Sequence, residues 1–217
     1  MKFTNWISIN RFGKYSIVFL DRFKKIILYL KEAYQECLTP PLRLHNVIKE
    51  MEFIGNQSLN IILLSGFTIG AVFALQVGMI LKIFQAESII GFITTKSLTR
   101  ELAPIMTAFL LSGRAGSAIT AEIATMKVTE QIDAMEAMAV NPIHYIVKPK
   151  IIAALIMTPI LSSIFVIIGV IGSFIVAVVI FDVNQGIYIY RIINGVKAQE
   201  LLMGLEKSLV FGVIVVL

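Results

Sequence analysis

The sequence has a single cysteine and little charge for its length. Cys37 cannot form a disulfide framework and has no CxxC partner, so we interpret it as a small apolar residue. Charged residues make up only 15% of the 217 residues, whereas hydrophobic residues make up 57%. Soluble globular chains carry about 25% charged residues, and disordered chains have few apolar ones. The composition therefore excludes a disulfide scaffold and a disordered chain, and it favours a protein whose solvent is largely the lipid bilayer.

Catalytic motifs are also missing. The sequence contains no GxxxxGK[ST] phosphate loop, no HExxH zinc helix and no GxSxG nucleophile elbow. The two histidines, His45 and His144, are far apart in the sequence. We therefore predict no catalytic residue and no metal site, and an intramembrane enzyme is the least favoured hypothesis.

The chain is basic, with a net charge of +5. Nine of its 19 Lys and Arg residues lie in the first 50 positions, just ahead of the first long apolar run. Cations placed there are explained by membrane topology and anionic headgroups, so no nucleic-acid partner is predicted. Within this segment, bulky residues recur every three or four positions over 11–38, which predicts an amphipathic helix in the headgroup plane that ends at Pro40-Pro41.

Four long apolar runs follow this N-terminal region of residues 1–60. A run of about 20 residues spans the hydrocarbon core, and the run over 151–181 is too short for two spans, so tilt or a bend at Pro159 would accommodate it. We predict an all-α, multi-pass membrane protein with an interfacial N-terminal helix and four or five transmembrane helices. The expected spans within the domain over 61–217 are 61–81, 102–124, 151–181 and 201–217.

The distribution of Lys and Arg between the spans predicts the orientation. With the N-terminus inside, twelve of them lie on the inner side, in 1–60 and 125–150. Five lie on the outer side, in 82–100 and 182–200. The positive-inside rule therefore places the loop over 125–150 on the inner side.

Charges inside the apolar runs are the strongest functional signal. Arg114 and Glu122 lie in the second run, where an unpaired charge is costly. They are eight residues apart, too far for a pair within one helix, so we expect partners on other helices; alternatively, Arg114 lies in a flanking loop. Small residues over 112–118 and the pairs Gly66–Gly70 and Gly169–Ser173 predict close approach of neighbouring helices.

Two further charged pairs border the spans. Arg100 and Glu101 precede Pro104, and Glu206 and Lys207 interrupt the last run. Such pairs on two helices form either a structural ion-pair cluster or a polar socket for a lipid headgroup. The residues alone leave these alternatives open.

The inner loop combines an acidic and an apolar stripe. Thr129 is the expected N-cap, Asn141-Pro142 the expected stop, and the helix is expected over 129–140. Methionines beside isoleucine give an adaptable apolar stripe. This pattern predicts a docking element for a soluble partner, with a plain connecting helix as the alternative. The stripes consist of Ile132, Met135 and Met138 or Ala139, and of Glu130, Asp133 and Glu136.

Two stretches resemble one known family. The segment SLTRELAPIMTAFLLSGRAGSAITAEIA and the following TMKVTEQIDAMEAMAVNP are similar to the signature of the MlaE family, the permease subunits of ABC transporters that move phospholipids. The family includes cyanobacterial and plastid-encoded members. The resemblance covers the chain from about residue 45 onward, and family members usually continue for some tens of residues beyond position 217.

The resemblance implies a homodimer with two copies of a separate ATPase on the inner face and an MCE-type lipid-binding protein on the outer face. ATP and Mg would be bound by the ATPase, and this chain would bind no cofactor. The membrane would be a plastid inner envelope or a bacterial inner membrane. The implied sites are a lipid cavity with Arg100, Glu101 and Lys207, and a coupling helix with Glu130, Gln131, Asp133 and Glu136; we assign Arg114 and Glu122 as internal structural charges.

A phospholipid permease is therefore the favoured hypothesis. A membrane scaffold that recruits a soluble partner through the loop over 125–150, without transport, is the alternative.

Overall fold

The computed structural model describes residues 43–216 and the isolated positions Asp21, Arg22, Lys24, Leu28 and Lys31. Residues 43–216 are helical apart from short connections. Apart from the five isolated positions, the amphipathic helix predicted over 11–38 lies outside the described residues, as does Pro40-Pro41. The predicted all-α fold is confirmed for the described part.

Within the described residues, three long helices have the length and apolar composition to cross a membrane: Leu44–Ile83, Glu87–Val128 and Ile143–Val179. Each is continuous but changes its winding along its length. The first contains α2 (Leu44–Met51), a π-helical turn (Glu52–Asn56) and α3 (Gln57–Ile83). The second contains a 3₁₀ turn (Glu87–Ile89), α4 (Ile90–Ser97), a π-helical turn (Leu98–Leu102), α5 (Ala103–Leu111), a π-helical turn (Ser112–Gly116) and α6 (Ser117–Val128). The third contains a π-helical turn (Ile143–Val147) and α8 (Lys148–Val179).

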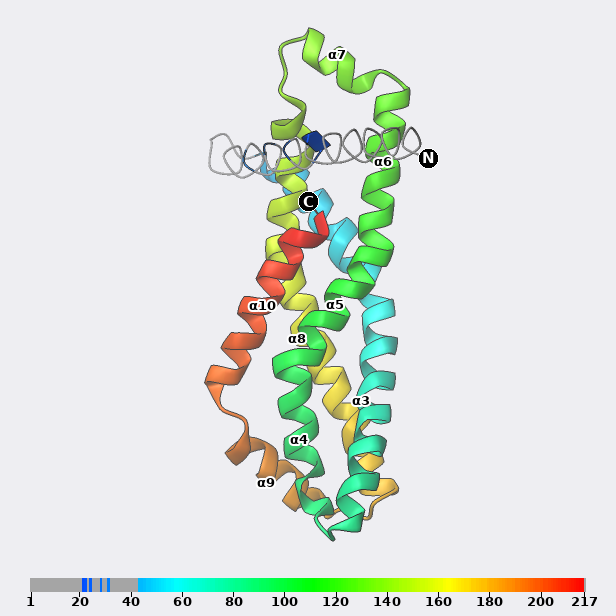
Figure 1. The fold of residues 1–217 in the computed structure, drawn as a ribbon, viewed down its shortest axis with the longest axis vertical. Helices are drawn as coiled ribbons and strands as arrows, with labels where there is room; N and C mark the ends of the chain where they lie inside the picture. Colours follow the sequence, from blue (N-terminus) through cyan, green and yellow to red (C-terminus); the bar gives the residue numbers. More distant parts are fainter. Residues whose placement is uncertain (1–20, 23, 25–27, 29–30, 32–42, 217) are drawn as a thin grey trace, which may run out of the picture.

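Shorter helices connect or follow these three. The helix α7 (Gln131–Ala137) joins the second long helix to the third, and α9 (Gln185–Gly195) joins α8 to α10 (Ala198–Val216). In Figure 1, α7 lies at one end of the bundle and α9 at the other. The residues of the loops over 125–150 and 182–200 therefore lie at opposite ends, as alternating spans require.

The observed helices differ from the expected spans in two places. The second span begins near Ile90 rather than at 102, because Lys96, Arg100 and Glu101 interrupt the apolar run without interrupting the helix. The last expected span, over 201–217, corresponds to α10, which is helical but is not among the three membrane-crossing helices. Its three charges lie in its first ten residues. By contrast, α8 is one unbroken helix of 32 residues with Pro159 inside it.

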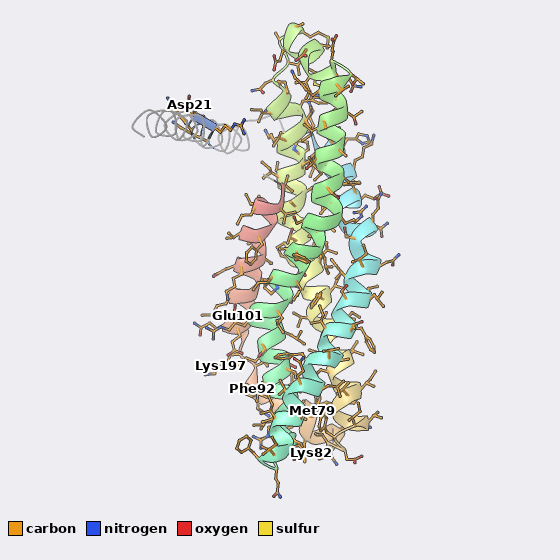
Figure 2. The ribbon with its side chains drawn as sticks, turned by 45° about the vertical axis from the view of Figure 1, so that its right-hand side comes forward. Asp21, Met79, Lys82, Phe92, Glu101 and Lys197 are labelled. Carbon is orange, nitrogen blue, oxygen red and sulfur yellow. The ribbon has the colours of Figure 1, made fainter. Side chains whose placement is uncertain are left out.

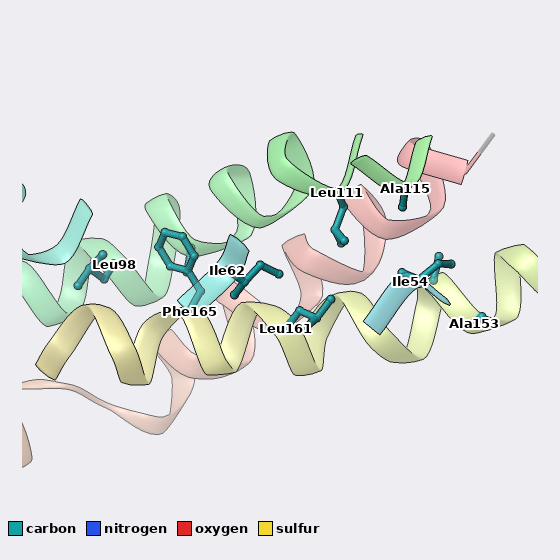
Figure 3. Close-up of a cluster of buried hydrophobic side chains, with 10 residues drawn as sticks. Ile54, Ile62, Leu98, Leu111, Ala115, Ala153, Leu161 and Phe165 are labelled. Atoms are coloured by element: carbon teal, nitrogen blue, oxygen red, sulfur yellow. The ribbon is translucent and has the colours of Figure 1, made fainter. Parts of the chain in front are cut away.

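The main hydrophobic core lies where the first and second long helices pack on α8. Figure 3 shows its side chains, with Leu161 and Phe165 of α8 facing Ile62 of α3 and Leu98 of the second helix. Phe165, Ile62 and Leu98 are completely buried. The core therefore fixes the relative position of the helices that carry the buried charges.

Glycine allows α3 and α8 to pack with their backbones in contact. A Cβ atom built on Gly70 would overlap the backbone of Gly169, and one on Gly172 would overlap the carbonyl of Phe67. The close approach predicted from these small residues is confirmed. It is not found at Gly113, where a Cβ atom would meet nothing within 4 Å.

We expect Gly70→Ala to lower the free energy of unfolding in detergent by about 2 kcal/mol or more, because the two helices must separate to admit the Cβ atom. The matched control is Gly113→Ala, which adds a Cβ atom to a helical glycine that has open space beside it. Its effect should stay within about 1 kcal/mol. Titration with sodium dodecyl sulfate, followed by circular dichroism, measures both. Equal effects of the two substitutions would contradict the packing described here.

Candidate functional site

Three of the charges singled out in the second long helix lie on π-helical turns. Arg100 and Glu101 are in the turn Leu98–Leu102, and Arg114 is in the turn Ser112–Gly116. A π-helical turn inserts an extra residue and changes the direction in which the following side chains point, and such turns are frequent at functional sites. Arg114 therefore lies within the helix, and the alternative that it belongs to a flanking loop is wrong.

Arg100, Glu101 and Lys207 form one cluster between the second long helix and α10. The Nζ atom of Lys207 lies 2.5 Å from Oε2 of Glu101 and donates to the backbone carbonyl of Arg100 at 3.2 Å. The Nε atom of Arg100 lies 3.3 Å from Oε1 of Glu101. Both oxygens of one carboxylate are thus engaged by two cations from different helices. In Figure 2, Glu101 lies on the side of the bundle, away from Met79 and Lys82 at the α9 end.

The cluster carries one positive charge in excess and is open to its surroundings. The side chains are between two-fifths and one-half exposed: Arg100 by 49%, Glu101 by 49% and Lys207 by 40%. Guanidinium and ammonium groups donate strongly to phosphate oxygens. Charge in a membrane-spanning segment needs a partner or water, so an anionic group facing this cluster would be stabilised.

A second ion pair joins the same two parts of the chain. Nζ of Lys96 in α4 lies 2.8 Å from Oε1 of Glu200 in α10, and Glu200 is only 12% exposed. Sequence reasoning missed this pair because Lys96 reads as one of the basic residues of an outer connection. The pair is therefore a second ionic contact between the second long helix and α10, separate from the Lys207 cluster.

Arg114 contacts the first long helix. Its Nη1 atom donates to the carbonyl of Phe53 at 2.6 Å and to Oγ of Ser58 at 2.9 Å, and its Nη2 atom donates to Oε1 of Gln57. The guanidinium carbon also lies 4.9 Å from the centre of the Phe53 ring. The arginine thus finds its acceptors on another helix, at the π-helical turn Glu52–Asn56 and the start of α3.

Glu122 also finds its partner on another helix. Its Oε2 atom lies 2.7 Å from Nζ of Lys150 in α8, and the same Nζ lies 2.7 Å from Oε1 of Glu50 in α2. Sequence reasoning singled out Glu122 but missed Lys150, which reads as an ordinary cation of the inner loop. Its partner Glu50 is 100 residues away, and no local pattern indicates that contact.

The loop helix is shorter than expected and begins differently. The prediction of Thr129 as N-cap is wrong: its Oγ1 donates to the carbonyl of Thr125 at 2.8 Å, and the residue ends α6. Glu130 is the N-cap, with a left-handed backbone at φ 58°, and Ala139 beyond the helix has φ 57°. Such residues cost about 1–2 kcal/mol each. The helix therefore covers Gln131–Ala137 rather than 129–140, and it ends before Asn141-Pro142 because the chain has already turned left-handed at Ala139.

The four acidic or polar residues predicted on this helix are all exposed. They are Glu130, Gln131, Asp133 and Glu136, at the end of the bundle formed by α7. Asp133 pairs with Lys127 of α6 at 2.5 Å, and both side chains are more than half exposed. No residue of α7 is buried. The helix thus presents two exposed acidic side chains, with Glu130 just before it, that the rest of the described chain does not bury.

A buried group of hydroxyls fastens α9 to the opposite end. The hydroxyl of Tyr188 lies 2.5 Å from Oγ of Ser173 in α8, which in turn lies 3.2 Å from Oγ1 of Thr94 in α4. Burial raises the pKa of the Tyr188 phenol above its ordinary value, so it remains protonated. Asn184 caps α9 by accepting from the amides of Gly186 and Ile187.

Among the residues that the structure describes, no three His, Cys, Asp or Glu side chains gather into a group that could hold a metal ion. Several of the described charges form ion pairs or hydrogen-bonded clusters. The arrangement is one of polar contacts between membrane-spanning helices, with an exposed acidic helix at one end.

Comparison with known proteins assigns the chain to a family. Residues 47–217 match the family Permease MlaE. The chain is 39% identical over 206 residues to a probable ABC transporter permease protein of Rickettsia felis, covering 95% of this chain and 80% of that protein. It is 42% identical over 179 residues to the intermembrane phospholipid transport system permease protein MlaE of Haemophilus influenzae, covering 81% and 69%. It is 35% identical over 196 residues to the probable ABC transporter permease protein ycf63 of Pyropia yezoensis, covering 90% and 74%. The chain therefore belongs to the MlaE permease family.

Proposed function

We propose that this chain is the permease subunit of an ABC transporter that moves phospholipids. The observation that carries the proposal is the open, net-cationic cluster of Arg100, Glu101 and Lys207 on two helices of a membrane protein. The name of the Haemophilus influenzae relative, an intermembrane phospholipid transport permease, supports the same substrate class.

In this proposal the cluster binds the lipid headgroup. Arg100 and Lys207 contact the phosphate, and Glu101 holds the two cations in place while the site is empty. A zwitterionic headgroup would also present an ammonium group to Glu101. The acyl chains remain among the apolar side chains of the spans, so only the headgroup contacts polar side chains as the lipid moves.

The driving energy comes from a separate subunit in this proposal. An ATPase binds ATP and Mg and contacts α7 from the inner side, where α7 presents the exposed carboxylates of Asp133 and Glu136. Two copies of the permease form the transport unit, and an MCE-type protein exchanges lipid on the outer face. The membrane is a plastid inner envelope or a bacterial inner membrane, for which relatives from Pyropia yezoensis and Haemophilus influenzae give support.

Reconstitution tests the proposal. The chain, its ATPase and its lipid-binding protein are placed in phosphatidylcholine vesicles that contain a fluorescent phosphatidylglycerol. We expect lipid to pass between the vesicles and the binding protein only when ATP is hydrolysed. Transfer that is absent, or that proceeds equally with a non-hydrolysable nucleotide, would contradict the proposed function.

A further inference from the structure

Lys150 is the most completely buried ion-pairing lysine of the described chain. Its side chain is 3% exposed, and its Nζ lies 2.7 Å from a carboxylate oxygen of Glu50 and 2.7 Å from one of Glu122. The three residues come from α8, α2 and α6. Buried lysines are rare unless they are paired, and a buried pair is sensitive to the removal of either partner. One ammonium group thus joins all three long helices.

The two ion pairs, Glu50–Lys150 and Glu122–Lys150, are called the tie below. Their position relative to α7 suggests their role. Glu122 lies six residues before the end of α6 at Val128, and Lys150 lies near the start of α8. These two helices precede and follow α7 in the chain and are called its arms below. The contact between Glu122 and Lys150 joins the ends of the two arms that lie nearest to α7. The third partner, Glu50, connects the joined arms to the first long helix.

The helix α7 contacts the described bundle mainly through α6, where Asp133 pairs with Lys127. It has no buried residue. Left-handed residues flank it at Glu130 and Ala139. Without a tie between the arms, a displacement of α7 would be absorbed by bending at its two ends. With the tie, both arms and the first long helix must move together.

A cavity beside the tie leaves room for such a movement. It has a volume of about 150 Å³ and is lined by Asn46, Glu122, Met126, Tyr145 and Lys150, among others. The second carboxylate oxygen of Glu50 is buried and has no hydrogen-bond partner. Glu50 also lines the cavity, so the group of ion pairs has empty space on one side.

We infer that Lys150 is a positioning residue that couples displacement of α7 to the three long helices. The inference rests on the proposed function, in which an ATPase moves α7. Lys150 contacts neither the cluster of Arg100, Glu101 and Lys207 nor the exposed surface of α7, so its loss should leave ATPase binding intact. The specific consequence is a loss of coupling: ATP is still hydrolysed, but less lipid is transferred for each ATP.

The test uses three variants in the reconstituted complex. Lys150→Met removes the charge but keeps the length of the side chain, and we expect lipid transferred per ATP to fall about tenfold or more. Lys150→Arg keeps a cation that can bridge two carboxylates and should retain transfer per ATP within about threefold. The triple variant Glu50→Gln, Glu122→Gln, Lys150→Met leaves no unpaired buried charge, so it should fold even if Lys150→Met does not, and it should be uncoupled.

A distance measurement separates this inference from the proposed function. Spin labels are placed at the exposed positions Thr125 of α6 and Ile48 of α2, in a chain with Cys37→Ser. We expect a narrow distance distribution with Lys150 or Lys150→Arg and a broad one in the triple variant. If the unaltered complex transfers no lipid, the proposed function fails, and these distributions still test the tie. Equal distributions, or normal transfer per ATP in the triple variant, would overturn the inference.

Discussion

Replacing Lys207 by alanine is expected to lower ATP-dependent lipid transfer by about tenfold or more. The substitution removes the cation that lies 2.5 Å from Glu101 and 3.2 Å from the carbonyl of Arg100. The cluster then loses its excess positive charge, and with it the attraction for a phosphate. Lys207→Arg keeps the charge and should retain most of the transfer. The measurement is the rate of fluorescent lipid transfer in the reconstituted complex.

The matched control for this prediction is Lys96→Ala. This substitution breaks the ion pair with Glu200, which joins the same two parts of the chain. If Lys207 were only a structural tie, the two substitutions would have similar effects on transfer. We expect Lys96→Ala to lower stability, because Glu200 is largely buried, and to leave transfer per folded complex nearly unchanged. Intact transfer with Lys207→Ala would show that the headgroup assignment is wrong.

Reversing the charge at Asp133 and Glu136 is expected to abolish co-purification with the ATPase. Both side chains are exposed on α7, where a complementary cationic groove would bind them. The double variant Asp133→Lys, Glu136→Lys should reduce the recovered ATPase by about tenfold or more. Co-purification from detergent at low salt measures this loss, which should be accompanied by a loss of stimulated ATP hydrolysis.

A charge exchange separates the interface from the local ion pair. Asp133 pairs with Lys127, so its reversal also places two cations side by side. The variant Lys127→Glu, Asp133→Lys restores an ion pair of opposite direction within the chain. If α7 is the contact surface, this exchange should still bind the ATPase poorly. Full recovery of binding would show that the local pair, rather than the interface, requires Asp133.

Apolar run length was sufficient to predict most of the membrane helices, because about 20 residues without charge have few other stable structures. The run over 151–181 is accordingly one helix. The residues from Ile90 to Glu101 escaped this reasoning because their charges are paired through contacts with α10, which are not visible in a local pattern. Helix extent there depends on tertiary partners.

The candidate sites show the same limit. The free-energy cost of an unpaired charge in the membrane was enough to single out Arg114 and Glu122. Their partners could not be predicted because they depend on how the helices pack. The π-helical turns that position Arg100 and Arg114 arise from shifted backbone hydrogen bonds, which side-chain periodicity does not report. Thr129 was misassigned because a threonine that ends one helix resembles one that starts the next.

The side of the membrane on which α7 lies decides whether an ATPase on the inner face can reach it. In a chain with Cys37→Ser, single cysteines are introduced at Ala137 of α7 and at Ile193 of α9, both of which are exposed. Intact right-side-out vesicles are then treated with a membrane-impermeant maleimide. We expect the cysteine at 193 to react from the outside and the cysteine at 137 to react only after permeabilisation. Reaction of the cysteine at 137 from the outside would contradict a transporter driven through α7 by an inner ATPase.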